Sequence, residues 1–261
     1  MISERVSRLA FPGILLLLFA CSATATAVWC MSMSDMGAVP MPGGWSMAMA
    51  WLPMCGQTWT GAAAAFTGMW LVMMVAMMLP SLVPMLRRYR STVTGGSGKG
   101  RPGWLTTLVG AGYFLVWGLA GLVVFPLGAG LADMLMRFPA LAQAGPLATG
   151  LVVLGAGVQQ FSAWKVRQLA CCRQAERVSG SAGAAWRHGL RLGLRCVRCC
   201  IGPTAILLVL GVMDLWVMAI VAVAISLERL AANGEHLARV TGAAAVATGV
   251  FLVAQAVVQG F

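Results

Sequence analysis

Three cysteines lie close together in the segment RHGLRLGLRCVRCCIGP. Cys196, Cys199 and Cys200 have the spacing i, i+3 and i+4, so on a helix their side chains fall within an arc of about 100°. A helix N-terminus and the neighbouring Arg195 and Arg198 favour the thiolate form, which binds Cu(I) or Zn(II) tightly. The spacing therefore predicts a site for a soft metal, copper before zinc. The alternative is a group of buried free cysteines that only packs.

Two further cysteines and a histidine lie in the preceding segment and extend this hypothesis. Cys171 and Cys172 are candidates to complete the site, although adjacent residues diverge on a helix, so we expect only one of them to be a ligand. His188 is a weaker candidate ligand, because a single histidine is more often a surface or interfacial residue.

Methionine is concentrated in two places. A thioether is a soft, uncharged ligand suited to Cu(I), and it does not form disulfides in an oxidising compartment. For the apolar run, the alternative is a pliable packing face. For the loop, the alternative is that it folds back onto the membrane, with tryptophans as interfacial anchors. The candidate ligands are Met73, Met74, Met77 and Met78 in MWLVMMVAMMLPS, and Met31, Met33, Met36, Met47 and Met49 in CMSMSDMGAVPMPGGWSMAMAWLPMC.

Cys30 and Cys55 enclose the second of these segments. In an oxidising exterior they are able to form a disulfide that closes the loop, and metal ligation by the same thiols is the other interpretation.

The elements that carry these residues are predicted from composition. The chain has 261 residues, of which 60% are hydrophobic and 10% charged, and this balance is typical of membrane proteins. Uncharged runs approach the roughly 20 residues that cross a bilayer, and without period-2 alternation they are expected to be helical. We predict an all-α, polytopic transmembrane bundle of six to seven spans: Pro12–Trp29, Ala62–Leu86, Trp104–Pro126, Leu147–Trp164, Cys196–Val212, Trp216–Leu230 and Val240–Val258. The fifth and sixth spans form either a tight hairpin around Met213 and Asp214 or one broken helix.

The net charge of +11 is explained by topology. With a cytoplasmic N-terminus, nearly all Lys and Arg, including Lys165 and Arg229, fall on the inner side, as the positive-inside rule requires. We therefore expect contact with membrane lipids, no nucleic-acid partner, and a multi-pass location in a bacterial inner membrane. The alternative for the first span is a cleaved signal peptide.

The segments between the spans complete a single membrane domain over 1–261. Residues 31–60 form a methionine-rich outer loop without Lys or Arg. Residues 90–103 and 165–195 form basic cytoplasmic loops, the second partly helical. Asp214 is expected at an outer turn and Glu228 at the inner membrane edge.

Five segments carry a resemblance to a known family: MWLVMMVAMMLPSLVP, GYFLVWGLAG, LGAGVQQFSAWKVRQLACCR, HGLRLGLRCVRCC and GVMDLWVMAIVAVAISLERL. Together they resemble the domain of unknown function 2182 family, over roughly Met69 to Gly242. Its members are described as predicted metal-binding integral membrane proteins, and sometimes as copper chaperones. The resemblance implies a helical membrane protein that binds a metal.

The functional hypothesis is that Cu(I) is captured outside and passed inward, or held for a membrane cuproenzyme or a periplasmic copper protein. No nucleotide-binding Gly-Lys-Ser/Thr motif is present, which argues against ATP-driven pumping by this chain alone. Two alternatives stay open: an enzyme, namely a membrane thiol-disulfide oxidoreductase, and a structural subunit that binds no metal.

Overall fold

The computed structural model describes residues 2–35, 37, 39–53, 56–94, 102–173 and 180–258. Within these ranges the secondary structure is helical apart from one short hairpin, so the prediction of an all-α fold is confirmed. The elements are α1 (Ile2–Asp35), β1 (Val39–Met41), β2 (Trp45–Met47), the 3-10 turn η1 (Met49–Trp51), α2 (Trp59–Thr94), α3 (Pro102–Arg137), α4 (Pro139–Gln143), α5 (Gly145–Gln159), α6 (Ala163–Arg173), α7 (Ala182–Leu210), α8 (Leu215–Leu230) and α9 (Gly234–Val258).

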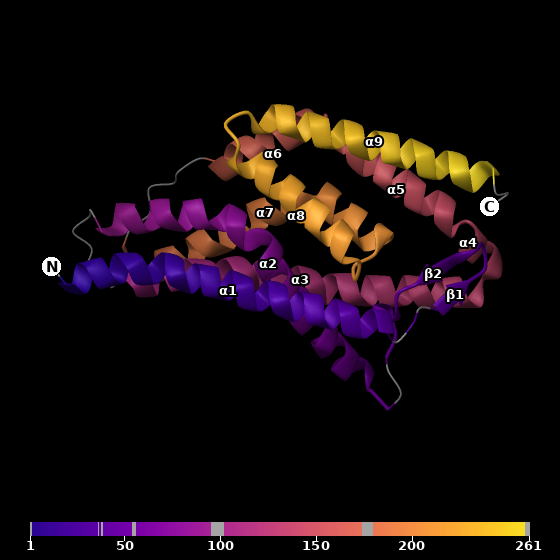
Figure 1. The fold of residues 1–261 in the computed structure, drawn as a ribbon, viewed down its shortest axis with the longest axis horizontal. Helices are drawn as coiled ribbons and strands as arrows, with labels where there is room; N and C mark the ends of the chain where they lie inside the picture. The colour runs from indigo at the N-terminus through magenta and orange to yellow at the C-terminus, as the bar shows by residue number, and fades with distance from the viewer. Residues whose placement is uncertain are drawn as a thin grey trace.

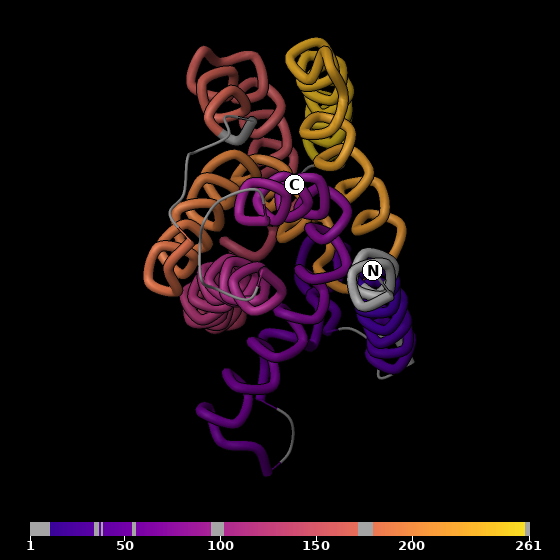
Figure 2. Tube along the Cα trace, turned by 90° about the vertical axis from the view of Figure 1, so that its left-hand side faces the viewer, coloured from indigo at the N-terminus to yellow at the C-terminus, as the bar shows by residue number. Residues whose placement is uncertain are grey.

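The long helices run roughly side by side, and α1 begins at the opposite end of the bundle from the end of α9 (Figure 1). Figure 2 looks along the bundle: α5 and α9 form one side, and α1, α2 and α3 lie on the other. Helix α7 packs against α3, α5 and α8, which makes it the central element. Helix α2 bends between its two halves (Figure 1), and Pro80 and Pro84 lie within it.

Five helices among the described residues are long and apolar enough to cross a membrane: α1 from Phe11 to Met33, α2, α3, α7 and α9. The number becomes six if α5 and α6 are taken as one bent span. Many large apolar side chains on these helices are exposed, for example Leu127 and Phe251, as expected for surfaces that face lipid.

The predicted fourth span, Leu147–Trp164, is not one straight helix. Helix α5 ends at Gln159, and α6 leaves it at an angle of 66°. Two side chains at the break explain the change of direction. Gln160 donates from Nε2 to Glu228 Oε1 at 2.9 Å, and Ser162 Oγ accepts from the backbone N–H of Lys165 at 3.2 Å, satisfying a donor in the first turn of α6.

The predicted fifth and sixth spans also need correction. Helix α7 begins at Ala182, within the segment predicted as a cytoplasmic loop, where Ser181 caps its first turn. Helix α8 has 16 residues, which is about 24 Å and shorter than a bilayer core of about 30 Å. The expected hairpin between them is confirmed: Gly211 adopts a φ of 139°, and Asp214 caps α8 by accepting from the N–H groups of Trp216 and Val217.

Glycines allow two helix pairs to approach closely. A Cβ added to Gly193 of α7 would lie 2.8 Å from the Tyr113 carbonyl oxygen of α3, and one added to Gly189 would meet Val109 of α3. A Cβ on Gly249 of α9 would meet the backbone of Leu154 in α5. Small residues at such contacts are typical of helices that associate in membranes.

The methionine-rich segment folds back onto the helices. β1 and β2 form an antiparallel hairpin, and Trp45 Nε1 donates to the carbonyl oxygen of Ala142 in α4 at 2.8 Å. Met41 and Met47 are buried there in a small apolar cluster with Ala132 and Ala142. At the hairpin, the methionine-rich segment therefore packs onto the protein itself.

Candidate metal centre

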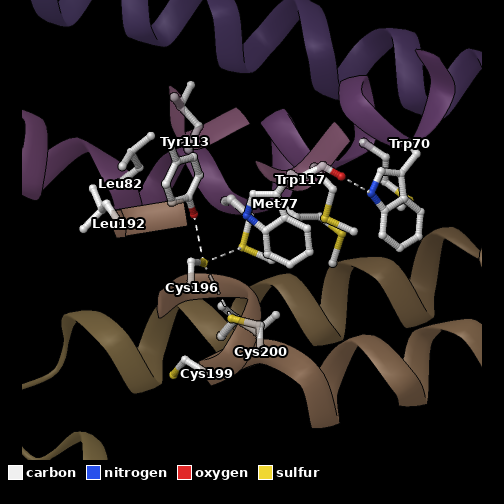
Figure 3. Close-up of a cluster of buried hydrophobic side chains, with 14 of the residues drawn as sticks. Trp70, Met77, Leu82, Tyr113, Trp117, Leu192, Cys196, Cys199 and Cys200 are labelled. Carbon is white, nitrogen blue, oxygen red and sulfur yellow. Dashed lines mark hydrogen bonds between the residues drawn. The ribbon is translucent and has the colours of Figure 1, made fainter. Parts of the chain in front are cut away.

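The sulfur of Cys196 is the centre of a buried group of polar and soft side chains. Tyr113 donates its hydroxyl to Cys196 Sγ at 2.9 Å, and Arg229 donates from Nη1 to the same sulfur at 2.9 Å. Two further sulfurs, Met78 Sδ and Cys200 Sγ, each lie 3.9 Å from Cys196 Sγ. Figure 3 shows Tyr113, Cys196 and Cys200 in this arrangement. All five side chains are buried.

Four helices supply these side chains. Cys196 and Cys200 are one turn apart on α7, Met78 comes from α2, Tyr113 from α3 and Arg229 from α8. Residues four apart on a helix face the same side, which places both thiols toward the interior. The glycine contacts between α3 and α7 bring Tyr113 close to Cys196.

The distances from Cys196 Sγ to the other two sulfurs are compatible with a shared metal ion. With metal–sulfur bonds of about 2.3 Å, two sulfur ligands of one tetrahedral or trigonal ion lie about 3.8 to 4.0 Å apart. Cys196 lies 3.9 Å from both Met78 Sδ and Cys200 Sγ. Two thiols and one thioether form a soft donor set, which is the kind that selects Cu(I).

The thioether is essential to this interpretation. Among the described residues, no group of three or more His, Cys, Asp or Glu side chains is placed to hold a metal ion. Cys199 is buried beside the other two cysteines, but its sulfur points away from Cys196 in Figure 3. Cys196 Sγ therefore has one thiol and one thioether at 3.9 Å, and Met78 supplies the thioether.

Arg229 places a permanent positive charge against this sulfur group. Besides Cys196, its Nη1 donates to Ser81 Oγ at 3.0 Å, and its Nη2 lies 3.8 Å from Met85 Sδ. Only 6% of Arg229 is exposed. A guanidinium carries its charge at all ordinary pH values, so it compensates the negative charge of thiolates or of a Cu(I) dithiolate.

A second buried charge pair lies next to the cysteines. Lys165 Nζ lies 2.8 Å from Glu228 Oε2, and both side chains are almost fully buried. Lys165 also donates to the carbonyl oxygen of Cys199 at 2.9 Å. The pair therefore joins α6, α7 and α8.

From the sequence, Lys165 and Arg229 were assigned to the inner side and Glu228 to the inner membrane edge, and the burial of all three side chains was not predicted. Tyr113 was not singled out. The sequence feature that could have identified Glu228 and Arg229 is their position as a Glu-Arg pair at the end of the apolar run of α8, since ionisable residues beside membrane segments are often functional.

The other predicted inner ligands lie apart from this group. His188 stacks on Tyr89 with ring centroids 5.5 Å apart, two turns of α7 before Cys196. Cys171 is half-buried near the end of α6 and does not complete a cysteine site in the described residues. The side chain of Cys172 lies outside those that the structure describes. Met73, Met74 and Met77 are buried in the core cluster with Met78.

The outer methionines occupy different environments. Met31 is 61% exposed on α1, and Met47 is buried in the hairpin cluster. Met33 and Met49 are half-buried and line a common cavity. Met36 and Cys55 lie outside the described residues, so the expectations for a ligand at Met36 and a Cys30–Cys55 disulfide are not addressed. Cys30 itself is buried and lies 3.9 Å from Met218 Sδ.

The fold and this centre define a class of protein: a bundle of long apolar helices with a buried group of soft sulfur donors. Comparison with family models identifies the family. Residues 67–252 match the PpoB2 family, described as copper chaperone, and the chain belongs to that family. This agrees with the resemblance that the sequence motifs indicated. No curated protein and no solved structure matches the chain.

Proposed function

We propose that this protein is a membrane-embedded Cu(I) chaperone, with Cys196, Cys200 and Met78 as the ligands of its inner site. The observation that carries the proposal is the position of Cys196 Sγ, 3.9 Å from both a second thiol and a thioether inside the bundle. Family membership supports copper as the metal. Buried soft donors favour Cu(I) over harder divalent ions.

Delivery to a recipient is favoured over pumping. The matched family is described as copper chaperone, and the sequence has no nucleotide-binding motif. The recipient would be a membrane cuproenzyme or a periplasmic copper protein. We place the protein in a bacterial inner membrane with a cytoplasmic N-terminus, because that orientation puts most Lys and Arg on the inner side.

The burial of the cysteines argues against a thiol-disulfide oxidoreductase. Catalytic thiols that exchange with partners are partially exposed, whereas Cys196 and Cys200 are exposed by no more than 1%. A compact cuprous ion reaches such a site more easily than a partner's disulfide. A purely structural subunit does not account for the pairing of Arg229 with Cys196, because a buried charge is costly to maintain.

The test is an anaerobic Cu(I) titration of the detergent-purified protein against a chromophoric chelator. The wild type is compared with the double variant Cys196→Ser, Cys200→Ser, and with Cys21→Ser, which removes an exposed thiol on α1. We expect tight binding in the wild type and in the Cys21 variant, and its loss in the double variant. Equal binding in all three proteins would refute the inner site, and no binding in the wild type would refute the copper function.

A further inference from the structure

A cavity of about 240 Å³ lies between α1, η1 and α2. It is separate from the cysteine group and is formed where the methionine-rich segment returns to the bundle. Three methionines line it, one from each element: Met33 near the end of α1, Met49 in η1 and Met69 in α2. Trp29 and Phe66 contribute aromatic walls.

The lining of this cavity has the chemistry of a Cu(I) site. Thioethers are neutral soft ligands that resist disulfide formation, so they keep their affinity for Cu(I) in an oxidising compartment. The surrounding segment, residues 30–61, contains no Lys or Arg that would repel a cation. Aromatic faces next to a cation add a favourable electrostatic contact.

The cavity also lies at one end of a row of buried sulfurs. Met69 is followed on α2 by Met73 and Met77 at i+4 and i+8, each step adding about 6 Å along the helix. Met73 and Met77 are buried in the same core cluster as Met78 and Cys196. Met73 and Met77 therefore place buried sulfurs on α2 between Met69, which lines the cavity, and Met78 of the proposed inner site.

We propose that Met33, Met49 and Met69 form a second Cu(I) site, at which the ion is first captured before it moves along α2 to Cys196. The site extends the proposed function, since it supplies the inner thiols with their metal. It is not implied by the family match, because residues 67–252 exclude Met33 and Met49. Neutral thioethers bind Cu(I) more weakly than thiolates, so the ion moves inward from a weaker site to a tighter one.

The experiment removes the thioethers of the cavity without removing their volume. The variant carries Met33→Leu, Met49→Leu and Met69→Leu, because exchange between Met and Leu conserves core volume and usually costs less than about 1.5 kcal/mol. The control carries Met41→Leu, Met134→Leu and Met136→Leu, which are three methionines that do not line the cavity. Both triple variants are made with and without Cys196→Ser and Cys200→Ser.

Anaerobic calorimetric titration with Cu(I) then separates the two sites. In the background that lacks Cys196 and Cys200 we expect one weak equivalent of Cu(I), with affinity reduced at least tenfold by the cavity substitutions and unchanged in the control. Absorption spectroscopy at the copper edge should show sulfur-only coordination before the substitutions. Equal affinity in both triple variants, or no binding in the background that lacks Cys196 and Cys200, would overturn the outer site.

This experiment tests the outer site independently of the inner site. If the protein with Cys196 and Cys200 intact binds no tight equivalent while the cavity methionines still bind Cu(I), the proposed inner site fails and the outer site stands. If the cavity triple variant unfolds, as circular dichroism would show, the single variant Met49→Leu in the half-buried η1 turn gives the same test. A tenfold loss in that variant supports the site, and an unchanged affinity contradicts it.

Discussion

Arg229 Nη1 donates a hydrogen bond to Cys196 Sγ at 2.9 Å inside the helical bundle. A buried guanidinium is costly unless its charge is compensated, and the groups it contacts include a thiol, two hydroxyls and a thioether. The contact with Cys196 is balanced in charge when Cys196 is a thiolate. It remains balanced when two thiolates hold Cu(I), because that unit carries one negative charge.

The first prediction concerns this charge. Arg229→Met should weaken Cu(I) binding by about ten- to a hundredfold, because a hydrogen bond to a charged group contributes about 1.5 to 3 kcal/mol. Zn(II) binding should fall less, since a Zn(II) dithiolate is neutral and needs no compensating cation. Competition titrations with both metals measure the two affinities.

The matched control is Arg198→Met, which removes an exposed arginine from α7 between the same cysteines. It should leave both affinities unchanged. If Arg198→Met and Arg229→Met weaken Cu(I) binding equally, the effect comes from the general positive field and not from the contact with Cys196.

Sequence reasoning reached the residues of the inner site but not their geometry. The i, i+3 and i+4 spacing predicts that the thiols of Cys196, Cys199 and Cys200 face one way. Those of Cys196 and Cys200 do, whereas the Cys199 sulfur points away from Cys196. The partners from other helices were not predictable in the same way. Tyr113 lies 83 positions before Cys196, and its contact depends on the close approach of α3 to α7 at glycines whose role is visible only in the packed bundle.

Helix positions were predicted better than helix ends. Apolar runs locate most helices, because hydrophobicity marks membrane segments directly. The start of α7 was missed because its first three turns contain Arg187 and Arg191, which a hydropathy criterion excludes. The break between α5 and α6 was missed because Gln160 interacts with Glu228, a residue distant in sequence.

The second prediction concerns the ion pair between Lys165 and Glu228. Lys165→Met alone or Glu228→Gln alone should destabilise the protein by about 3 to 5 kcal/mol, because each leaves a buried charge or a buried donor without its partner. The double variant should recover most of this loss. Thermal unfolding in detergent measures the effect.

The exposed pair Arg137–Asp133 provides the control, since its side chains are 69% and 50% exposed. Asp133→Asn should change stability by less than about 1 kcal/mol. Equal losses at the buried and the exposed pair would show that Lys165 and Glu228 are solvated in the native protein.

The third prediction tests the contact between α3 and α7. A Cβ on Gly112 would lie 2.9 Å from the carbonyl oxygen of Trp186, whereas one on Gly110, in the same helix, meets nothing within 4 Å. Gly112→Ala should therefore separate the helices, lower the melting temperature and weaken Cu(I) binding by displacing Tyr113 from Cys196. Gly110→Ala should stabilise slightly, since alanine is the better helix former. A melting temperature lowered equally by both would contradict the close packing.

The last prediction concerns the thioether of the inner site. Met78→Leu keeps the volume of the side chain but removes the sulfur that lies 3.9 Å from Cys196 Sγ. If Met78 is the third ligand, Cu(I) affinity should fall about tenfold or more while thermal stability changes little. Met74→Leu serves for comparison, because Met74 is fully buried on the same helix. A loss in Met78→Leu together with retention in Met74→Leu would identify a ligand by position, because burial and side-chain volume are matched between the two variants. Similar affinities in the two variants would instead assign Met78 to packing and leave Cys196 and Cys200 as a two-coordinate pair.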